Sequence, residues 1–414
     1  MRKYLFIFII FGSVLCHSQN WVNIDTIYDP SVKSLKFNLS GLQTVQPFIP
    51  LNSDLSLKLN WDILGEDAPQ LRYKIEYCNA DWSPTLVQRY EFMDGFEDEP
   101  IRDFIFSSGT FVSYIHYTLN LPNDNIRWLL SGNYLLHVYI DDPRTPLFTR
   151  RFCVTESLAK FGYTMNNPTE SYLVDTHHEF DFEIGIKGLY MNQPLTEIQA
   201  VITQNNRWDN AISGVRPKFL RNDVLVFDYE NKIVFGGGKE FRNFDIRNIR
   251  VTTPFVKKIN KYNNGIEALL VKEKSKGGST YNSGIIDADG KFIIQSQGQD
   301  FDEGDRSEYV EVVFDLAGDE DEEPVYVVGE LTDWQLKEEF RMKYDPTAKC
   351  LLNRVLLKQG RYEYGFATNV NGKANFDRWE GNSNDTQNTY SVLIYHRPFG
   401  QRYDRLIGVF SFKS

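Results

Sequence analysis

Apolar and polar residues alternate along several short stretches of the chain. Leu55, Leu57, Leu59 and Trp61 are separated by polar residues. Further strand-like stretches occur at 71–77, 114–119, 134–139, 180–186, 198–202 and 310–316. A period of two places successive side chains on opposite faces, as in a β-strand with one buried face. Turn residues separate the stretches and no helical periodicity lies between them, so the sequence predicts an all-β chain of tandem immunoglobulin-like sandwiches.

The spacing of these strands predicts four parts after the first 18 residues. They are a first sandwich over 19–156, a second over 157–258, a polar linker with a hairpin over 259–305, and a C-terminal immunoglobulin-like domain over 306–414. The linker assignment rests on its polar, mobile-looking stretches. Asp287-Ala288-Asp289-Gly290 is interpreted as the hairpin turn, because the spacing of a calcium-binding EF-hand would need an acid at position 285.

The N-terminus has the features of an export signal. Arg2 and Lys3 precede an apolar run from Tyr4 to Leu15, which is too short to span a bilayer, and small residues precede Gln19 at the positions that a signal peptidase requires. We therefore predict a signal peptide over residues 1–18 and a periplasmic mature chain. Acylation of Cys16, which would make the chain a lipoprotein, is an open alternative, disfavoured by the bulky Leu15 before it.

Charge excludes one class of partner. The chain has a formal net charge of −11, and removal of the signal peptide makes it more negative. Nucleic-acid binding needs a basic surface, so none is expected. No later segment is hydrophobic enough for a membrane helix, and the mature chain is therefore expected to have no membrane span.

Three cysteines remain after cleavage, namely Cys78, Cys153 and Cys350. An odd number cannot be fully paired within one molecule. Cys78 and Cys153 both fall in the predicted first sandwich, and an oxidising periplasm permits a bridge between them. The sequence leaves open whether this disulfide forms.

No motif predicts catalysis, a metal site or a cofactor. Gly236-Gly237-Gly238-Lys239 lacks the spacing of a phosphate-binding loop, since Glu240 follows where Ser or Thr is required. His177 and His178 are adjacent on a predicted strand and point to opposite faces. Acids such as Asp81, Asp94 and Asp377 are abundant, but no spacing brings a catalytic pair together. We therefore expect no catalytic residue, no metal ligand, no cofactor and no small-molecule substrate.

The stretch from Leu71 to Phe96 is the most distinctive of the chain. Its strand ends in Asn79-Ala80-Asp81-Trp82-Ser83-Pro84, where polar side chains can bond their own backbone and Pro84 ends the pairing. Trp82 is then free to fold back over the sandwich as a structural lid. A contact with a partner protein is the alternative for Trp82.

The last predicted domain resembles the immunoglobulin-like modules that precede the catalytic domains of glycogen-branching enzymes. The resemblance rests on Gly329-Glu330-Leu331-Thr332-Asp333-Trp334 and on the stretch 356–364. In those modules the aromatic after the turn is chiefly architectural, so Trp334 is expected in the core. The alternative, a sugar-binding platform at Trp334, would make the chain a periplasmic carbohydrate-binding protein.

Motifs along nearly the whole mature chain resemble those of the plug proteins of the type IX secretion system. They are Cys78-Asn79-Ala80-Asp81-Trp82, Gly95-Phe96, Ser131-Gly132-Asn133-Tyr134, Arg150-Arg151-Phe152, 204–211, 240–245 and 402–408. The resemblance implies a non-catalytic periplasmic protein. The role that the resemblance implies is to close the periplasmic end of the giant outer-membrane translocon β-barrel when no carrier or substrate is bound, and that barrel is the expected partner.

The resemblance does not identify the face that docks on the barrel. Besides Trp82, an aromatic in the loop-like segment Asp377–Gly381 is a candidate partner contact, namely Trp379.

Overall fold

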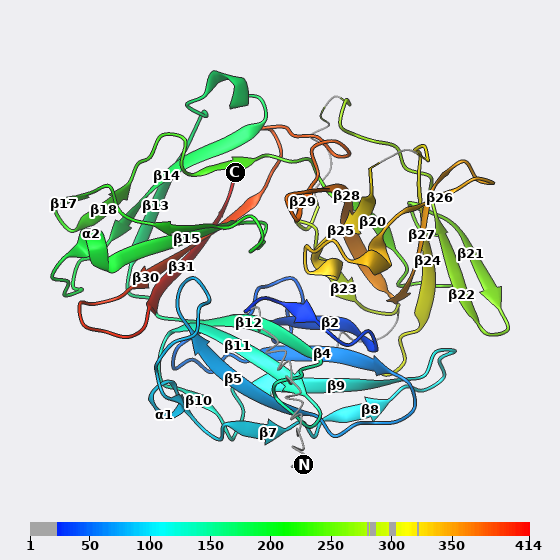
Figure 1. Cartoon of the computed structure of the whole chain (residues 1–414), viewed down its shortest axis with the longest axis horizontal. Helices are drawn as coiled ribbons and strands as arrows, with labels where there is room; N and C mark the ends of the chain where they lie inside the picture. The colour runs from blue at the N-terminus through cyan, green and yellow to red at the C-terminus, as the bar shows by residue number, and fades with distance from the viewer. Residues whose placement is uncertain (1–22, 280, 282–286, 298–303, 321–322) are drawn as a thin grey trace, which may run out of the picture.

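The computed structural model describes residues 23–279, 281, 287–297, 304–320 and 323–414. The predicted signal peptide and the first half of the predicted hairpin, Ile285-Ile286, lie outside these residues. Strands dominate the described chain, in several antiparallel sheets, and the all-β prediction is confirmed. Figure 1 shows a lower body that carries two upper bodies side by side.

The lower body is the first sandwich, formed by two facing sheets. One sheet has the order β1 (Thr26–Ile27), β12 (Phe148–Thr155), β11 (Gly132–Tyr139), β5 (Arg72–Cys78) and β7 (Asp98–Pro100), with β3 (Phe48–Pro50) beside β12. The other has the order β2 (Val32–Leu39), β4 (Leu57–Leu64), β9 (Tyr114–Leu121) and β8 (Phe104–Phe106). A short helix α1 (Arg89–Phe92) and the pair β6 (Met93–Asp94) and β10 (Arg127–Trp128) close one end.

Alternating side chains of both sheets fill the core of this sandwich. Trp61 stacks on Tyr117 with ring centroids 5.3 Å apart and meets the edge of Phe148 from the facing sheet. The alternation predicted for this strand is confirmed from Leu57 onward, whereas Leu55 precedes β4 and is exposed. Aromatic side chains therefore join the two sheets, since such rings fill the space between pleated surfaces well.

The second sandwich combines strands from two separate parts of the chain, β13 to β19 and β30 to β31. Its first sheet has the order β13 (Lys160–Asn166), β14 (His177–Gly185), β18 (Val224–Phe227) and β17 (Phe219–Arg221), with β19 (Val234–Gly236) also beside β14. Its second has the order β16 (Ile212–Val215), β15 (Ile198–Gln204), β30 (Thr389–His396) and β31 (Arg405–Lys413). The helix α2 (Pro194–Glu197) precedes β15. The last two strands of the chain thus complete this sandwich.

The third sandwich is formed by residues between β19 and β30. One sheet has β28 (Gly360–Val370) paired with β20 (Arg242–Asp245), β23 (Phe292–Ile294), β25 (Val325–Val328) and β29 (Lys373–Asn375). The facing sheet has the order β21 (Val256–Tyr262), β22 (Gly265–Leu270), β24 (Tyr309–Leu316), β27 (Cys350–Lys358) and β26 (Lys343–Asp345). Short 3₁₀ helices at Ser171–Leu173, Glu330–Thr332 and Glu338–Phe340 complete the elements.

These sheets divide the chain differently from the predicted boundaries. Strand β22 and most of β21 lie in the predicted linker, yet β22 pairs in parallel with β24 and its apolar face enters the third core. Strand β20, assigned to the second sandwich, pairs with β28 of the third. The predicted C-terminal domain contains β30, whose side chains share one core with β14 and β15. The predicted boundaries group strands that follow one another in sequence. Pairing between strands far apart in sequence leaves no local signal.

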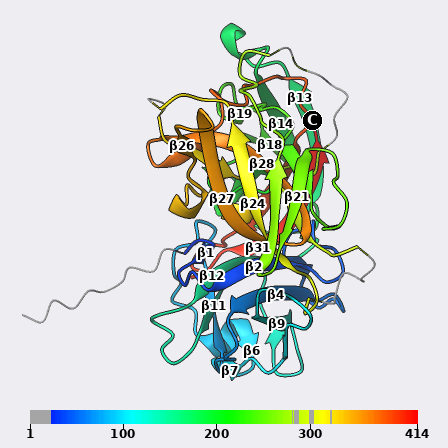
Figure 2. The ribbon, with the colours of Figure 1, turned by 90° about the vertical axis from the view of Figure 1, so that its right-hand side faces the viewer.

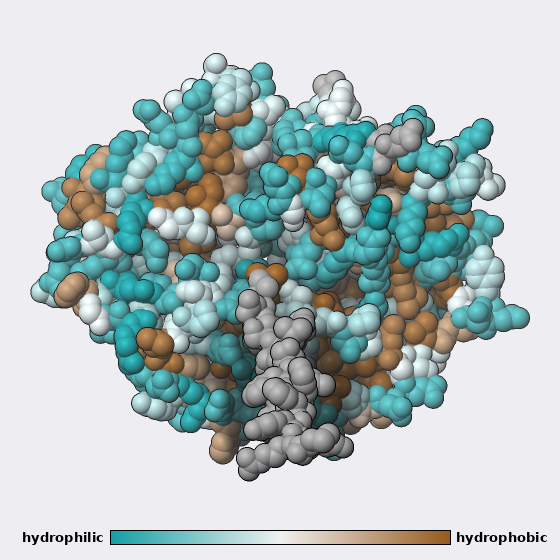
Figure 3. Space-filling model, viewed as in Figure 1, coloured by the Kyte–Doolittle hydropathy of each residue, from teal (hydrophilic) through white to brown (hydrophobic). Residues whose placement is uncertain are grey.

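The three sandwiches surround a common junction. Figure 1 shows the second and third sandwiches standing on the first, and Figure 2 shows the same stacking from the side. The second sandwich contacts β11 and β12 through β31, and the third contacts β2 through β27. A separate small cluster joins the first two sandwiches, and it includes Cys78, Trp82, Leu393 and Tyr395. In the space-filling view hydrophilic residues predominate on this face, and apolar ones form separate small groups (Figure 3).

Candidate functional site: the junction of the three sandwiches

A cleft of about 250 Å³ lies where the three sandwiches meet. Each sandwich contributes polar, charged or aromatic side chains to its walls. They are Asp25, Trp82, Arg150 and Arg151 from the first, Asn205, Trp208 and Asp209 from the second, and Lys291, Glu330, Asp333 and Trp334 from the third. Three groups of contacts hold the sandwiches together at or near this cleft, and a fourth does so away from it.

Arg151 joins the first and second sandwiches. Its guanidinium carbon lies 5.2 Å from the ring of Trp82 and 5.1 Å from that of Trp208, which meet edge to face. Its Nε and Nη2 donate to one oxygen of Asp25 at 2.9 and 2.8 Å. The planar guanidinium is suited to this position, because it can stack on rings while its edge bonds a carboxylate.

Arg207 makes the equivalent contact between the second and third sandwiches. Its guanidinium carbon lies 4.7 Å from the ring of Trp334 and 5.1 Å from that of Phe376. It also donates from Nη2 to Asp209 at 2.6 Å. Both arginines thus place a cation on an aromatic face and neutralise it with a carboxylate of the same region.

The first and third sandwiches are joined by ion pairs at the cleft. Arg150 Nη2 lies 3.1 Å from Asp333, and Lys36 Nζ lies 2.6 Å from Glu330. Burial disfavours the charged form of Asp333, but Arg150 and Lys337 together hold the pKa of this carboxyl below its usual value. Asp333 is therefore ionised and paired at neutral pH.

A second buried ion pair joins the same two sandwiches away from the cleft. Lys358 Nζ lies 2.6 Å from Asp62 Oδ2, and both side chains are inaccessible to solvent. Asp62 also accepts a hydrogen bond from the Tyr309 hydroxyl and contacts His116 Nδ1, each at 2.6 Å. Burial opposes ionisation of Asp62, but Lys358 and His116 lower its pKa below the usual value. The carboxylate is thus held by groups from both sandwiches.

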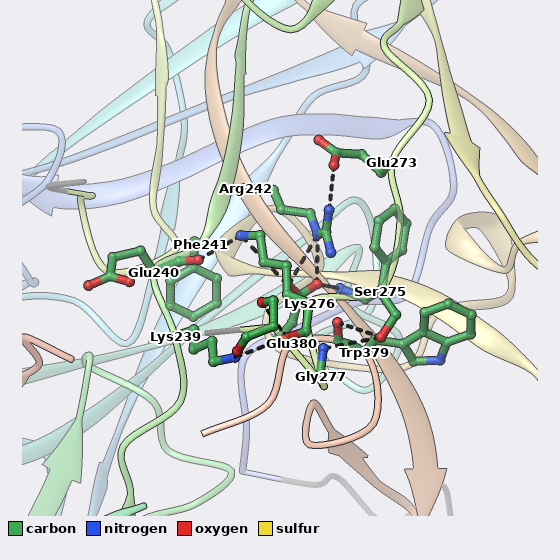
Figure 4. Close-up of polar contacts among 12 residues, drawn as sticks. Lys239, Glu240, Phe241, Arg242, Glu273, Ser275, Lys276, Gly277, Trp379 and Glu380 are labelled. Atoms are coloured by element: carbon green, nitrogen blue, oxygen red, sulfur yellow. Dashed lines mark hydrogen bonds and ion pairs between the residues drawn. The ribbon is translucent and has the colours of Figure 1, made fainter. Parts of the chain in front are cut away.

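A further ionic cluster lies inside the third sandwich (Figure 4). Arg242 Nε donates to both oxygens of Glu380, at 2.8 and 3.1 Å, and Nη1 donates to Glu273 at 2.5 Å. Lys276 donates through its backbone N–H to the Trp379 carbonyl at 2.7 Å. This cluster fixes the segment 273–279, which the sequence predicted to be polar and mobile, against the loop that carries Trp379.

The three tryptophans singled out from the sequence are all buried. Trp82 lies between the first two sandwiches, as a lid would, and its ring contacts Trp208 and Arg151. Trp334 lines the junction, with Arg207 covering its ring. Trp379 belongs to the core of the third sandwich and is 4% exposed. None of the three offers a free ring to a sugar or to a partner protein in this structure.

The cysteines are free thiols in the described chain, and all three are buried. Cys78 and Cys153 both lie opposite Asn133, on the two strands that flank β11. Two strand spacings, about 10 Å, separate their backbones, whereas a disulfide needs Cα atoms within about 7 Å. The disulfide that the sequence left open is therefore absent from this structure.

Sequence reasoning missed Asp62, Lys358 and the roles of the two junction arginines. Arg151 and Arg207 stood within motifs that resemble the plug family, so a signal existed, although it gave no contact. Asp62 and Lys358 had no signal, because they are 296 residues apart and each reads as a surface charge on an alternating strand. Within the described residues no group of three or more His, Cys, Asp or Glu could hold a metal ion.

These contacts define a class of protein: an all-β body of three sandwiches whose buried charges serve to hold the sandwiches together. A family model described as "Type 9 secretion system plug protein 1st domain" matches residues 32–156, which run from β2 to just past the end of β12. The chain belongs to the plug protein family of the type IX secretion system. The family points to a role in secretion, rather than catalysis, and to a location in the cell envelope.

The chain is also similar to a solved structure over nearly its whole length. A crystal structure of a hypothetical protein from Parabacteroides merdae ATCC 43184 is 31% identical, with a TM-score of 0.88, and the match covers 94% of this chain and 99% of that chain. All three sandwiches therefore have counterparts in that protein. An alkylpurine DNA glycosylase from Pseudomonas fluorescens matches 30% of each chain at 13% identity with a TM-score of 0.18, which carries no argument. No curated protein matches the chain.

In the part of the chain that the structure describes, no helix is long and apolar enough to cross a bilayer.

Proposed function

We propose that this chain is a periplasmic plug that closes the periplasmic end of the outer-membrane translocon barrel of type IX secretion when no carrier or substrate is bound. The observation that carries the proposal is the junction described above, in a chain of the plug family. A barrel of that size encloses a water-filled lumen that its own side chains cannot fill. A body that closes the barrel must be broad, and its sandwiches must not separate at their interfaces, which are called seams below.

The buried contacts at the seams meet this requirement. Arg151 binds the first sandwich to the second, Arg207 the second to the third, and Lys358 the third to the first. Each sandwich is thus bound to both of the others. A hinge motion between two sandwiches would therefore disrupt a contact with the third. This arrangement supports a cap that binds and leaves as one body.

A patch at one end of the molecule is suited to dock on the barrel. It consists of Leu86, Tyr90 and Phe399, which are largely exposed, and Phe399 is 92% exposed. Arg402 ties the two loops together, since it donates to Glu91 at 2.6 Å and to the Leu86 carbonyl. Figure 1 shows α1 and the β30–β31 connection at the same end. Exposed aromatic anchors that span two bodies are typical of a protein contact.

Outer-membrane leakage in the native host tests this proposal. We expect deletion of the gene to admit a large antibiotic that an intact outer membrane excludes, and the wild-type chain to restore exclusion. The double variant Tyr90→Ser/Phe399→Ser should fail to restore it and should not co-purify with the barrel. The control Tyr172→Ser/Val370→Ser removes exposed apolar groups elsewhere and should behave as wild type.

Two outcomes would overturn the proposal. Deletion cells that exclude the antibiotic as well as wild-type cells do would contradict the plugging role. Recovery of the tagged wild-type chain without the barrel would contradict the partner. If Tyr90→Ser/Phe399→Ser restored exclusion fully, the docking role of this patch would be contradicted, whereas the plugging role would not.

A further inference from the structure

One stretch of this acidic chain is strongly basic. The whole chain has 45 Lys and Arg against 56 Asp and Glu, yet no acid occurs between Asp245 and Glu267. Five cations stand in that interval: Arg247, Arg250, Lys257, Lys258 and Lys261. Such a local inversion of charge is unlike the solvated, mixed-charge surface of an ordinary domain, and it favours an anionic partner.

The cations that lie on strand β21 are available to a partner. Arg247 is paired with Asp245 at 2.5 Å, but Arg250 and the three lysines are exposed and make no ion pair among the residues that the structure describes. A bulge between Val256 and Lys258 turns two successive lysines outward, since a bulge interrupts the alternation of a strand.

Large apolar side chains accompany these lysines at the surface. The exposed fractions of Val251, Phe255 and Tyr262 are 61%, 50% and 53%. Phe255 has φ of +67°, a backbone conformation that bulky residues rarely adopt. The chain therefore accepts local strain at a residue whose ring it does not bury, which is typical of a functional position.

The same surface continues onto the first sandwich. Lys261 Nζ lies 5.8 Å from the ring of Phe111, which is itself exposed and whose backbone N–H donates to Glu308 at 2.6 Å. Among the strands of the described chain, β21 pairs with β22 alone, and it forms the edge of its sheet. Figure 2 looks onto the side of the molecule where this edge lies.

We propose that this surface, named here the β21 edge and consisting of Arg250, Val251, Phe255, Lys257, Lys258, Lys261 and Tyr262, binds a membrane surface that contains anionic phospholipid. Lysines near such a surface are attracted to the headgroups, and Phe and Tyr side chains enter the boundary between headgroups and acyl chains. An exposed edge where cations stand beside aromatic rings suits a soft, flat lipid surface. The binding would hold an acidic protein against the membrane in one orientation.

This inference does not depend on the proposed plugging role. The β21 edge lies at the opposite end of the molecule from Phe399 and the β30–β31 connection, on the right of Figure 1. Variants of the two surfaces can therefore be tested separately.

Co-sedimentation of the purified mature chain with vesicles is the test. We expect binding to vesicles of phosphatidylethanolamine with phosphatidylglycerol, and none to vesicles of phosphatidylcholine alone. Raising the salt from about 0.05 M to about 0.5 M should reduce the binding at least fivefold, because the Debye length shortens. The variant Lys257→Glu/Lys258→Glu/Lys261→Glu should reduce it by at least about tenfold.

Two further variants separate this surface from net charge and from misfolding. Lys187→Glu/Lys343→Glu/Lys373→Glu changes the net charge equally at exposed positions elsewhere and should bind as wild type. Phe255→Gly relieves the left-handed backbone, so it should keep or raise the melting temperature while weakening vesicle binding.

Equal losses in the two triple variants would overturn the proposal, because net charge alone would then govern binding. Absence of wild-type binding to the phosphatidylglycerol vesicles would also overturn it. If that result came with loss of the translocon barrel from pull-downs of the β21 variant, the edge would be a protein contact instead.

Discussion

Lys358 lies 2.6 Å from Asp62, and this pair joins the third sandwich to the first without access to solvent. A buried ion pair contributes little net stability compared with an apolar pair of the same shape, because both charges lose their hydration. It does impose a penalty on any arrangement that separates the partners. The pair therefore specifies how the two sandwiches sit on each other.

The first prediction concerns this pair. Lys358→Met leaves the Asp62 charge buried, and we expect it to lower the free energy of unfolding by about 3 to 5 kcal/mol. The double variant Asp62→Asn/Lys358→Met should lose much less than the sum of the single variants. Urea denaturation measures all three. Lys33→Met, which removes an exposed pair with Glu339 at the same interface, should cost less than about 1 kcal/mol. Additive losses would contradict the coupling.

The second prediction concerns Arg151 between Trp82 and Trp208. Arg151→Lys keeps the charge beside Asp25 but loses the planar group, and we expect a loss of about 1 to 2 kcal/mol, with about 2 to 4 for Arg151→Ala. Tryptophan emission should change in both variants, which thermal unfolding followed by fluorescence would record. Arg144→Ala removes an exposed arginine and should leave both readings unchanged. A wild-type melting curve for Arg151→Lys would contradict the stacking role.

The third prediction is a pH dependence due to Glu363. Burial, and then Asp287, raise the pKa of this carboxyl to about 7, although the backbone N–H groups of Ala288 and Gly290 oppose the rise. The native state therefore binds a proton that the unfolded state has released between pH 4.5 and 7. Stability from this group is complete below that window and falls as the pH rises through it.

Glu363→Gln removes the titration. We expect the variant to be more stable than wild type at pH 8, on the order of 2 kcal/mol, and to lack this part of the slope in a series of denaturation curves from pH 4.5 to 8. Glu338→Gln is exposed and should keep the wild-type slope. A slope unchanged in Glu363→Gln would show that this carboxyl is already ionised in the native state.

The fourth prediction concerns the thiols. Burial raises the pKa of Cys78 to about 12 and also raises that of Cys153, so neither thiol is reactive in the native protein. We expect no labelling by a thiol reagent under native conditions. In denaturant without reductant, mass spectrometry of the mature chain should find label on Cys78, Cys153 and Cys350. Label on Cys350 alone would show that the other two are joined.

Much of the fold could be predicted from local pattern. The alternation of Leu57, Leu59 and Trp61 and that of Phe180, Phe182 and Ile184 place these residues in strands, and their side chains do enter the cores. The motifs that resemble the plug family identified the family. Both signals are local, because a strand buried on one face must alternate whatever its partners are.

The roles of the charged residues could not be predicted in the same way. Asp62 and Arg242 read as surface charges, and the polar segment 272–278 reads as a mobile linker, until strands from elsewhere cover them. The sequence predicts Trp82 as a lid over the first sandwich, but it gives no sign that the ring contacts Trp208 of the second sandwich. The sequence makes Trp379 a candidate partner contact, because nothing in its own segment indicates that the ring is buried in the third core.

The sequence by itself determined the all-β class, the positions of most strands, the family and the local excess of lysines on an acidic chain. Only the tertiary structure decided that β30 and β31 close the second sandwich, that the third is inserted within it, and that buried arginines and lysines join all three. The physical reason is the range of each interaction. Alternation and charge along a strand involve neighbours in sequence, whereas strand pairing and burial of ions join residues hundreds of positions apart.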